Sequence, residues 1–229
     1  MLKQLRPALM SVLAFTIITG FLFPFAVTGI AQGIFPKQAR GSLIVQDGKT
    51  IGSEIIGQSF AQPGYFHSRP SAAGSGYDAS ASSGTNLGPT SSKLIKGIPD
   101  DPKTKDADES YAGIPQLAAA YRKENNLAAN APVPADAVTR SASGLDPEIS
   151  PENAALQVPR VAAARKLSPD DVQKLVSENT AGRTLGLLGE ARVNVVLLNL
   201  ALDKAAPTTT PTPAPSPAAS PAPAASVAP

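Results

Sequence analysis

The residues of this chain that could perform covalent chemistry are a single histidine, many serines and scattered aspartates. His67 is the only histidine, and both cysteine and tryptophan are absent. These counts exclude a disulfide framework, a thiolate metal site, a cysteine nucleophile and a His-rich zinc site. A Ser–His–Asp hydrolase is the one catalytic template that the composition permits. It would combine His67 with Ser71, Ser141 or Ser143 and with Asp78 or Asp146.

This catalytic interpretation lacks its usual sequence context. There is no G-x-S-x-G nucleophile motif, and serine is expected in loops because its hydroxyl bonds to nearby backbone. There is also no G-x-x-x-x-G-K-[ST] phosphate loop. Gly74-Ser-Gly76 weakly resembles the glycine fingerprint of dinucleotide-binding proteins, but it lacks the helix that such a fingerprint begins. The simpler alternative is that His67 ends a strand and bonds to its own loop.

The charge balance excludes nucleic acid as a partner. The chain has 20 Lys+Arg and 18 Asp+Glu. Lys3 and Arg6 supply two of the positive charges, so residues 7–229 carry no formal net charge and no basic field.

An uncharged, apolar run near the N-terminus predicts a transmembrane helix over residues 8–34, after a short tail of residues 1–7. A helix needs about 20 residues to cross the hydrocarbon core, and this run exceeds the 7–15 residues of a signal-peptide core. Gly20 and Pro24 lie in mid-span, where they are tolerated if a neighbouring helix packs closely. They are therefore candidate contacts with a partner in the bilayer.

The orientation is predicted from what must cross the membrane. Lys3 and Arg6 precede the span and Lys37 and Arg40 follow it, so positive charges alone do not decide it. The short N-terminal tail has nothing to translocate, and no second apolar span follows. We expect a single-pass protein of the cell inner membrane, with a cytoplasmic N-terminus and a large extracytoplasmic domain.

Residues 40–204 predict one small mixed α/β domain. An Asp-Gly turn at 47–48 between apolar runs 42–45 and 50–56 predicts a hairpin, and residues 64–69 a short third strand. Residues 70–92 read as a long loop, residues 98–113 as an acidic insertion or linker, and residues 205–229 as a disordered Pro/Ala-rich tail.

Helices are predicted where apolar spacing coincides with start signals. One runs from about Pro115 to Asn125 with a stripe of Leu117, Ala120, Tyr121 and Leu127. Ser150-Pro151 and Ser168-Pro169 each combine an N-cap serine with proline at the first helical position. The run 193–198 predicts a buried strand that continues as a helix to Lys204.

Three segments rich in Ser, Gly, Asn and Asp are not explained by helix or strand patterns: GYFHSRPS at 64–71, SGTNLGP at 83–89 and SASGLDP at 141–147. Arg69, Arg160 and Arg165 could brace these loops or contact a partner. Gln157 and Arg160 share one helix face and either brace the 141–147 loop or touch a partner. The candidate interface residues are Gly20, Pro24, Arg69, Asn86, Ser143, Asp146, Gln157 and Arg160.

At these segments the chain resembles the C-subunit (KdpC) family of the Kdp-type potassium-transporting ATPase. The resemblance is collinear over roughly residues 3–204. Besides the three loops it rests on LRPA at 5–8, Thr19-Gly20, Pro24, GSLI at 41–44, Gly52-Ser53, IGQSF at 56–60, QVPRVA at 157–162, Val193-Asn194 and LNLALD at 198–203. The acidic stretch at 98–114 and the tail after Lys204 depart from the family pattern.

This resemblance implies a non-catalytic accessory subunit of a high-affinity, ATP-driven potassium uptake complex. Its implied partners are a channel-like potassium-translocating subunit, a P-type ATPase subunit and membrane lipid. The family is described as a catalytic chaperone that raises the ATP affinity of the ATPase subunit. The resemblance thus implies no directly bound cofactor or metal and no catalytic residue, with ATP reached through the ATPase subunit and potassium as the transported ion.

Two alternatives from other functional classes remain open at this point. One is a membrane-anchored extracytoplasmic Ser/His hydrolase, and the other is an envelope-binding module whose tail reaches toward the cell wall. A domain outside the membrane cannot touch cytosolic nucleotide, so any effect on ATP affinity would have to be indirect or the topology inverted.

Overall fold

The computed structural model describes residues 4–99 and 110–206 of the chain. The chain forms two compact units, Met1–Ser53 and Glu54–Pro229. Residues 207–229 of the predicted disordered tail and residues 100–109 of the predicted acidic insertion lie outside the described residues. Ala205, the first residue of the predicted tail, is instead the last residue of a helix. The hairpin groups with the apolar helix, whereas the sequence analysis placed it in a domain starting at residue 40.

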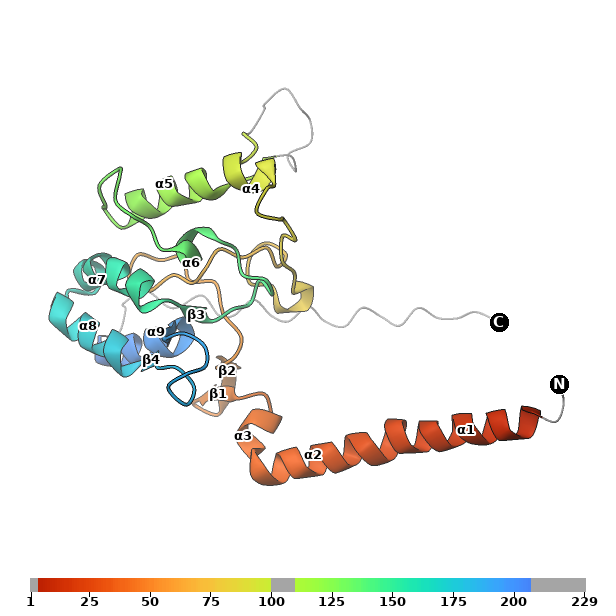
Figure 1. The fold of residues 1–229 in the computed structure, drawn as a ribbon. Helices are drawn as coiled ribbons and strands as arrows, with labels where there is room; N and C mark the ends of the chain where they lie inside the picture. Colours follow the sequence, from red (N-terminus) through yellow and green to blue (C-terminus); the bar gives the residue numbers. More distant parts are fainter. Residues whose placement is uncertain (1–3, 100–109, 207–229) are drawn as a thin grey trace, which may run out of the picture. The chain divides into compact units, whose positions relative to one another are not determined.

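The first unit contains one long apolar helix, built from α1 (Leu5–Ile17), η2 (Ile18–Leu22) and α2 (Phe23–Ile34) (Figure 1). Within the described residues, Leu5–Ile34 is the helix long and apolar enough to cross a membrane, and its side chains are not buried within the chain. The predicted single membrane-spanning helix is therefore confirmed by length and composition.

The η2 segment is π-helical and directly precedes Pro24. Proline has no N–H and its ring clashes with the carbonyl four residues back, which here is Gly20. A single π turn widens the helix at this point, so that the Phe23 N–H bonds to the Ile18 carbonyl five residues back. Pro24 is thus accommodated without ending the helix.

The rest of the first unit is α3 (Pro36–Ala39) and a hairpin of β1 (Leu43–Gln46) and β2 (Lys49–Ser53). Asp47 and Gly48 both have positive φ, 51° and 74°, as a two-residue type I′ turn requires. The predicted hairpin is confirmed, and its second strand ends at Ser53 instead of continuing to residue 56.

The second unit begins with irregular chain that contains the short helices η3 (Ala79–Ala81) and α4 (Ser92–Lys96). It continues with α5 (Ile114–Glu124) and α6 (Ala135–Val138) (Figure 1). The helix predicted near 115–125 is confirmed, although the buried residues of α5 are Ala118 and Tyr121, while Ala120 is exposed. Ile98 and Tyr111 form an antiparallel bridge, so the described flanks of the acidic stretch lie side by side.

The core of the second unit lies between three helices and a small sheet. The helices are α7 (Pro151–Arg165), α8 (Pro169–Glu178) and α9 (Val195–Ala205), and the antiparallel sheet has the order β3 (Glu148–Ile149), β5 (Arg192–Asn194), β4 (Thr180–Ala181). Their buried apolar residues are Phe66, Ile149, Ala154, Val158, Val161, Ala162, Val172, Val176, Val193, Val195, Leu198 and Leu202.

The predicted helix starts are confirmed by their caps. Ser150 Oγ accepts the Asn153 N–H at 3.1 Å, and Ser168 Oγ accepts the Asp171 N–H at 3.1 Å. The run 193–198 differs from the prediction, because the strand ends at Asn194. The Asn194 side chain caps the next helix by accepting the Leu197 N–H at 3.0 Å, which starts α9 at Val195.

The third strand predicted at 64–69 does not form. Side-chain amides from two helices take the backbone groups that a neighbouring strand would otherwise pair. Asn199 of α9 accepts from the Phe66 N–H and donates to its carbonyl, both at 2.9 Å. Gln157 of α7 does the same for His67, at 2.7 and 3.1 Å. Tyr65 and Phe66 are buried, and the backbone groups of Phe66 and His67 are bonded without being part of a sheet.

Candidate functional site

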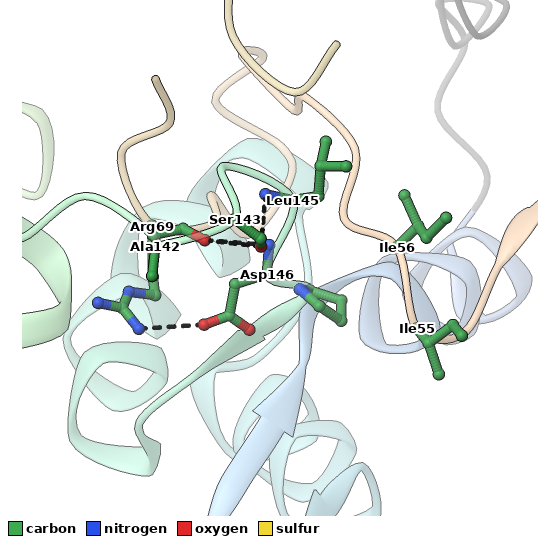
Figure 2. A pocket seen from close by; sticks show the side chains of 9 residues that line it. Ile55, Ile56, Arg69, Ala142, Ser143, Leu145 and Asp146 are labelled. Atoms are coloured by element: carbon green, nitrogen blue, oxygen red, sulfur yellow. Dashed lines mark hydrogen bonds and ion pairs between the residues drawn. The ribbon is translucent and has the colours of Figure 1, made fainter. Parts of the chain in front are cut away.

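One surface hollow of the second unit, which we call the main hollow, has a volume of about 520 Å³. It is open to solvent, and three separate segments of the chain line it. Ile55 and Ile56 lie along one side and the Arg69 and Asp146 side chains meet on the other (Figure 2). The full lining is Ile55, Ile56, Arg69, Ser141, Ala142, Ser143, Leu145, Asp146 and Pro147. It brings together three of the predicted interface residues, Arg69, Ser143 and Asp146.

An ion pair between Arg69 and Asp146 forms the polar part of this hollow. Arg69 Nη1 lies 3.0 Å from Asp146 Oδ2, and both side chains are about one quarter exposed. Arg69 Nη2 also donates to the carbonyl and the hydroxyl of Thr139, at 3.4 and 3.3 Å. Arg69 therefore joins the 64–71 and 141–147 segments, as the bracing alternative predicted, while part of its guanidinium still faces the surface.

Tyr77 bonds to two of the residues that line the main hollow. Its hydroxyl donates to the Arg69 carbonyl at 2.8 Å and lies 3.3 Å from the Asp146 carbonyl. Burial raises the pKa of Tyr77 to about 12, so the hydroxyl stays protonated and keeps donating at any physiological pH. The sequence analysis did not single out Tyr77. Its left-handed backbone, φ 57°, in a loop of small residues is not visible in a sequence pattern.

The loops around the hollow approach so closely that only glycine fits at three positions. A Cβ on Gly57 would lie 2.5 Å from the Tyr77 ring and 2.8 Å from the Asp146 carbonyl oxygen. A Cβ on Gly84 would lie 2.5 Å from the Ala142 carbonyl, and one on Gly144 2.6 Å from the Ala73 Cβ. The Ser/Gly-rich segments are thus interlocked, ordered loops.

The hydroxyls of the 141–147 segment bond within that segment, and a hydroxyl of the 64–71 segment bonds to its backbone. Ser141 Oγ lies 3.2 Å from Ser143 Oγ and accepts the Gly144 N–H at 3.0 Å. Ser143 Oγ accepts the Leu145 N–H at 3.1 Å. Ser71 Oγ donates to the Gly144 carbonyl at 2.7 Å.

His67 does not join any of these serines. Its Nε2 faces the Gln62 carbonyl at 3.0 Å and its Nδ1 the Glu124 carboxylate at 2.5 Å. Both ring nitrogens are occupied, and Asp146 pairs with Arg69. The contacts therefore do not build the Ser–His–Asp arrangement, and a hydrolase mechanism through His67 has no geometric support.

The second unit also has a smaller hollow of about 200 Å³. His67, Tyr121, Glu124 and Gln157 are among its lining residues. The hydrogen bond from His67 lowers the pKa of the Glu124 carboxyl, and burial raises the pKa of the Tyr121 hydroxyl. The Tyr121 hydroxyl donates to Asn153 Oδ1 at 2.8 Å, so polar groups that line this hollow already form hydrogen bonds with one another.

Gln157 and Arg160 lie inside the second unit, not on its surface. Gln157 is 1% exposed, and its Oε1 accepts from both the His67 N–H and Arg160 Nη2, at 2.7 and 2.8 Å. Arg160 is 9% exposed and donates to the Pro63 and Tyr65 carbonyls, at 2.6 and 2.9 Å, and to Asn125. Burial lowers the pKa of Arg160.

These contacts correct the sequence analysis in two respects. The polar atoms of Gln157 and Arg160 bond inside the domain, which argues against direct contact with a partner. The segment that they brace is 63–67 and not the 141–147 loop. Their spacing indicated one helix face correctly, but spacing alone does not say whether that face is covered.

The remaining candidates occupy separate parts of the chain. Gly20 lies in η2 and Pro24 in α2, on the apolar helix. Asn86 is exposed and has φ 53°, a left-handed conformation that asparagine tolerates. Over residues 4–99 and 110–206, no group of three or more His, Asp or Glu side chains is placed to hold a metal ion.

The sequence analysis also missed several buried polar braces. Asp136 accepts the Ser150 N–H at 2.8 Å and the Asn153 amide at 2.9 Å. Arg165, which the sequence analysis did name as a possible loop brace, pairs with Asp203 at 2.7 Å and donates to the Gly64 carbonyl at 2.6 Å. A polar residue inside an apolar helical run, such as Asn199 in LNLALD, is the kind of signal that could have identified such braces.

Comparison with known proteins places this arrangement in a family. Residues 5–204 match KdpC, the family described as the K+-transporting ATPase, c chain. A protein of Mycobacterium tuberculosis (strain ATCC 25618 / H37Rv) named Potassium-transporting ATPase KdpC subunit is 53% identical over 204 residues, covering 89% of this chain and 100% of the relative.

Proteins of the same name from two other bacteria are similar over nearly their whole lengths. The one from Beijerinckia indica subsp. indica is 49% identical over 211 residues, covering 92% of this chain and 98% of the relative. The one from Caulobacter vibrioides (strain NA1000 / CB15N) is 52% identical over 208 residues, covering 90% and 96%. The matched region includes the apolar helix and the braced loops of the second unit.

Proposed function

The chain belongs to the KdpC family, the c chain of K+-transporting ATPases, and from this premise we propose that it assembles and stabilises the potassium-pumping complex as a non-catalytic subunit. Its partners are the channel-like potassium-translocating subunit and the P-type ATPase subunit, with potassium as cargo. The observation that carries this proposal is the family match over residues 5–204, which includes both the apolar helix and the braced domain.

The geometry of the second unit supports a contact role. The side chains that could take part in chemistry, His67, Asp146 and Gln157, bond to partners within the unit. What remains at the surface of the main hollow is an ion pair beside Ile55, which is 63% exposed. A rigid surface that combines apolar side chains with a fixed charge pair is suited to recognising another protein.

We test assembly by expressing the complex with and without this chain and purifying it through a tag on the ATPase subunit. We expect the potassium-translocating and ATPase subunits to stay together only when the chain is present. Recovery of the same active complex without the chain would overturn the proposal. The variant His67→Ala serves as a control. An assembly subunit should still support the active complex in this variant, whereas a hydrolase that uses His67 would lose its hydrolytic activity.

The proposed orientation places the N-terminus in the cytoplasm and the second unit outside it. It is supported by the single candidate spanning helix within the described residues. Alkaline phosphatase fused after Lys204 should be active, since this enzyme folds only outside the cytoplasm, and a cytosolic reporter at the same place should be inactive. The reverse pattern would overturn the orientation.

We further propose that the chain raises the ATP affinity of the ATPase subunit through the complex, and not by binding nucleotide itself. An extracytoplasmic domain has no access to cytosolic ATP, and the sequence contains no phosphate loop. The KM for ATP of the ATPase subunit purified without the chain should exceed that of the complete complex, while the full chain alone should bind no labelled ATP analogue. Direct labelling of the isolated chain would contradict this route.

A further inference from the structure

Four consecutive backbone carbonyls of the second unit each lie within hydrogen-bond distance of a basic side chain. They belong to the residues that we call the carbonyl turn, which are Gln62, Pro63, Gly64 and Tyr65. Arg160 donates to the second and fourth of these oxygens, at 2.6 and 2.9 Å, and Arg165 donates to the third at 2.6 Å. The ring of His67 contacts the first, with its Nε2 at 3.0 Å from the oxygen. Three basic side chains thus hold the carbonyl turn.

His67 differs from the two arginines because it can lose its charge near neutral pH. A guanidinium stays protonated in proteins, whereas an imidazole is the side chain that ordinarily changes charge between about pH 5 and 8. The His67 side chain is 20% exposed, so protons from the solvent can reach it. Of the three basic side chains on the carbonyl turn, His67 is therefore the one that the pH of the surroundings can alter.

Both ring nitrogens of His67 face groups that accept hydrogen bonds. Nε2 faces the Gln62 carbonyl, which has no proton to donate, and Nδ1 faces the Glu124 carboxylate at 2.5 Å. The hydrogen bond from His67 lowers the pKa of the Glu124 carboxyl, so this group is ionised near neutral pH and only accepts. A neutral imidazole has a single N–H, whereas the charged ring has two. The geometry therefore fits the charged ring, which can donate to both acceptors.

The nearest charged groups favour this state of the ring. Glu124 is the last residue of α5, and the C-terminal end of a helix carries a partial negative charge that adds to the attraction of the carboxylate. The opposing charge is Arg160 of α7. Arg160 is directed to the carbonyl turn and to Gln157 Oε1, the same atom that accepts the His67 N–H.

The other titratable groups packed around this region have partners of their own. Asp203 of α9 pairs with Arg165 at 2.7 Å. Asp136 of α6 accepts from the Asn153 amide at 2.9 Å. The Tyr121 hydroxyl of α5 stays protonated, because burial raises its pKa. Glu124 is therefore the carboxylate that controls the charge of the His67 ring.

Loss of one proton leaves the ring with a single N–H for two acceptors. The remaining proton stays on Nδ1, because a hydrogen bond to a carboxylate is stronger than one to a neutral carbonyl. The lone pair of Nε2 then faces the lone pairs of the Gln62 oxygen, and the contact becomes repulsive. Arg160 and Arg165 keep their hydrogen bonds to the carbonyl turn, so the change is confined to its Gln62 end.

We propose that His67 is a pH-sensitive switch, which holds the Gln62 end of the carbonyl turn while its ring is charged and releases it when the ring is neutral. Along the chain, the carbonyl turn connects Ile55 and Ile56, on one side of the main hollow, to Arg69 on the other. The charged ring therefore stiffens the connection between the two sides of the hollow. The switch lies within this chain, so its test needs no partner subunit.

The single histidine of the chain makes the charge of the ring directly measurable. The full chain is labelled with 15N-histidine, and the ring nitrogen resonances are recorded in detergent between about pH 5 and pH 9. We expect both nitrogens to be protonated at the acid end, and Nε2 alone to lose its proton as the pH rises. Loss of the Nδ1 proton instead, or a ring whose charge is constant over the whole range, would overturn the inference.

Release of the carbonyl turn is measured by amide hydrogen exchange, expressed relative to an unstructured peptide at the same pH. The Tyr65 N–H donates to the Gln62 carbonyl at 3.0 Å, so its exchange reports on this end of the turn. We expect its protection to fall about tenfold from the acid to the alkaline end, as for the loss of one hydrogen bond. Protection of α8, the internal control, should not change. Equal protection of Tyr65 at both ends would overturn the switch.

Two variants show whether the His67 ring causes the change. His67→Gln has no titratable ring, so protection of the carbonyl turn should not depend on pH. Glu124→Gln keeps the ring but removes the carboxylate that favours its charge, so protection should fall at a lower pH than in the wild type. Glu178→Gln, on the surface of α8, is the matched control and should behave as the wild type.

Glu124→Gln also decides the matter if His67→Gln fails to fold, because the Glu124 side chain is 39% exposed and its replacement leaves the core intact. The same pH dependence in Glu124→Gln as in the wild type would show that the pair does not control the carbonyl turn, and the inference would fail.

Discussion

Asn199 pairs with Phe66 as a neighbouring strand would, accepting from its N–H and donating to its carbonyl, both at 2.9 Å. Gln157 repeats this pairing with the next residue, His67. Two amide side chains from α9 and α7 thus hold a buried, irregular segment in place. Because Phe66 is fully buried, loss of either amide leaves backbone groups without a partner in a site that excludes water.

Gln157→Ala is therefore expected to destabilise the full chain. The change removes four hydrogen bonds, to the His67 N–H and carbonyl, to Asn153 and to Arg160, and leaves their buried partners unsatisfied. We expect a loss of about 2–4 kcal/mol in unfolding free energy. Thermal unfolding in detergent measures it, with Gln173→Ala on the exposed face of α8 as the control. A melting temperature unchanged by Gln157→Ala would return this residue to a contact role.

Gly57→Ala is expected to disturb the main hollow. Its Cβ would lie 2.5 Å from the Tyr77 ring and 2.8 Å from the Asp146 carbonyl oxygen, so the interlocked loops must separate. Overpacking of this kind costs about 1–3 kcal/mol. Gly88→Ala is the matched control, since no atom lies within 4 Å of its added Cβ. Equal melting temperatures for the two variants would show that the loops are less tightly interlocked than the structure indicates.

The His67–Glu124 pair predicts a small pH dependence of stability. The hydrogen bond from His67 lowers the pKa of Glu124. A lowered carboxyl pKa stabilises the fold above the unfolded value of about 4.3, and this contribution is lost as the pH falls through the folded value. Because Glu124 is 39% exposed, we expect less than about 1 kcal/mol.

The measurement is thermal unfolding of the full chain and of Glu124→Gln between about pH 3 and pH 7. The two melting curves should differ near neutral pH and converge at the acid end. Glu178→Gln, whose carboxylate lies 4.0 Å from Lys174 on the surface, is the control. A constant difference across the whole range would mean that the pair contributes by packing alone.

Gly20→Leu is expected to weaken assembly in the membrane without breaking the helix. The added Cβ would meet only the Thr16 Cγ2, at 4.0 Å, so the isolated chain has room for the larger side chain. Close packing against a neighbouring helix depends on small residues, and a leucine would push that helix away. We expect less partner subunit in pull-downs of Gly20→Leu than in those of Gly29→Leu, with equal membrane insertion of both. Equal recovery of partners would contradict a specific contact at Gly20.

Sequence patterns predicted the parts of this protein that depend on neighbours along the chain. The apolar run of the spanning helix, the Asp47-Gly48 turn and the capped starts at Ser150 and Ser168 all appear in the structure. Each depends on a local cause: a hydrophobic length, a pair of residues that tolerate positive φ, or a hydroxyl that accepts an orphan N–H.

The site could be predicted only in part. The loops that meet at the main hollow were recognised by their composition and by their resemblance to a family. Their partners were not, since Arg69 and Asp146 lie 77 residues apart along the chain. Tyr77, Asp136 and Asn199 were missed because a buried polar residue is recognisable only once its neighbours are known.

The sequence by itself determined the membrane helix, the helix starts, the hairpin and the family to which the chain belongs. Only the tertiary structure decided that residues 64–67 form no strand, that Gln157 and Arg160 bond inward and that three leucines face outward. The physical reason is that a sequence pattern indicates which polar groups need hydrogen-bond partners, whereas packing between distant parts of the chain decides which partners those groups find. An amide from α9 pairs with the Phe66 N–H in place of a neighbouring strand, and Leu185, Leu187 and Leu188 are exposed.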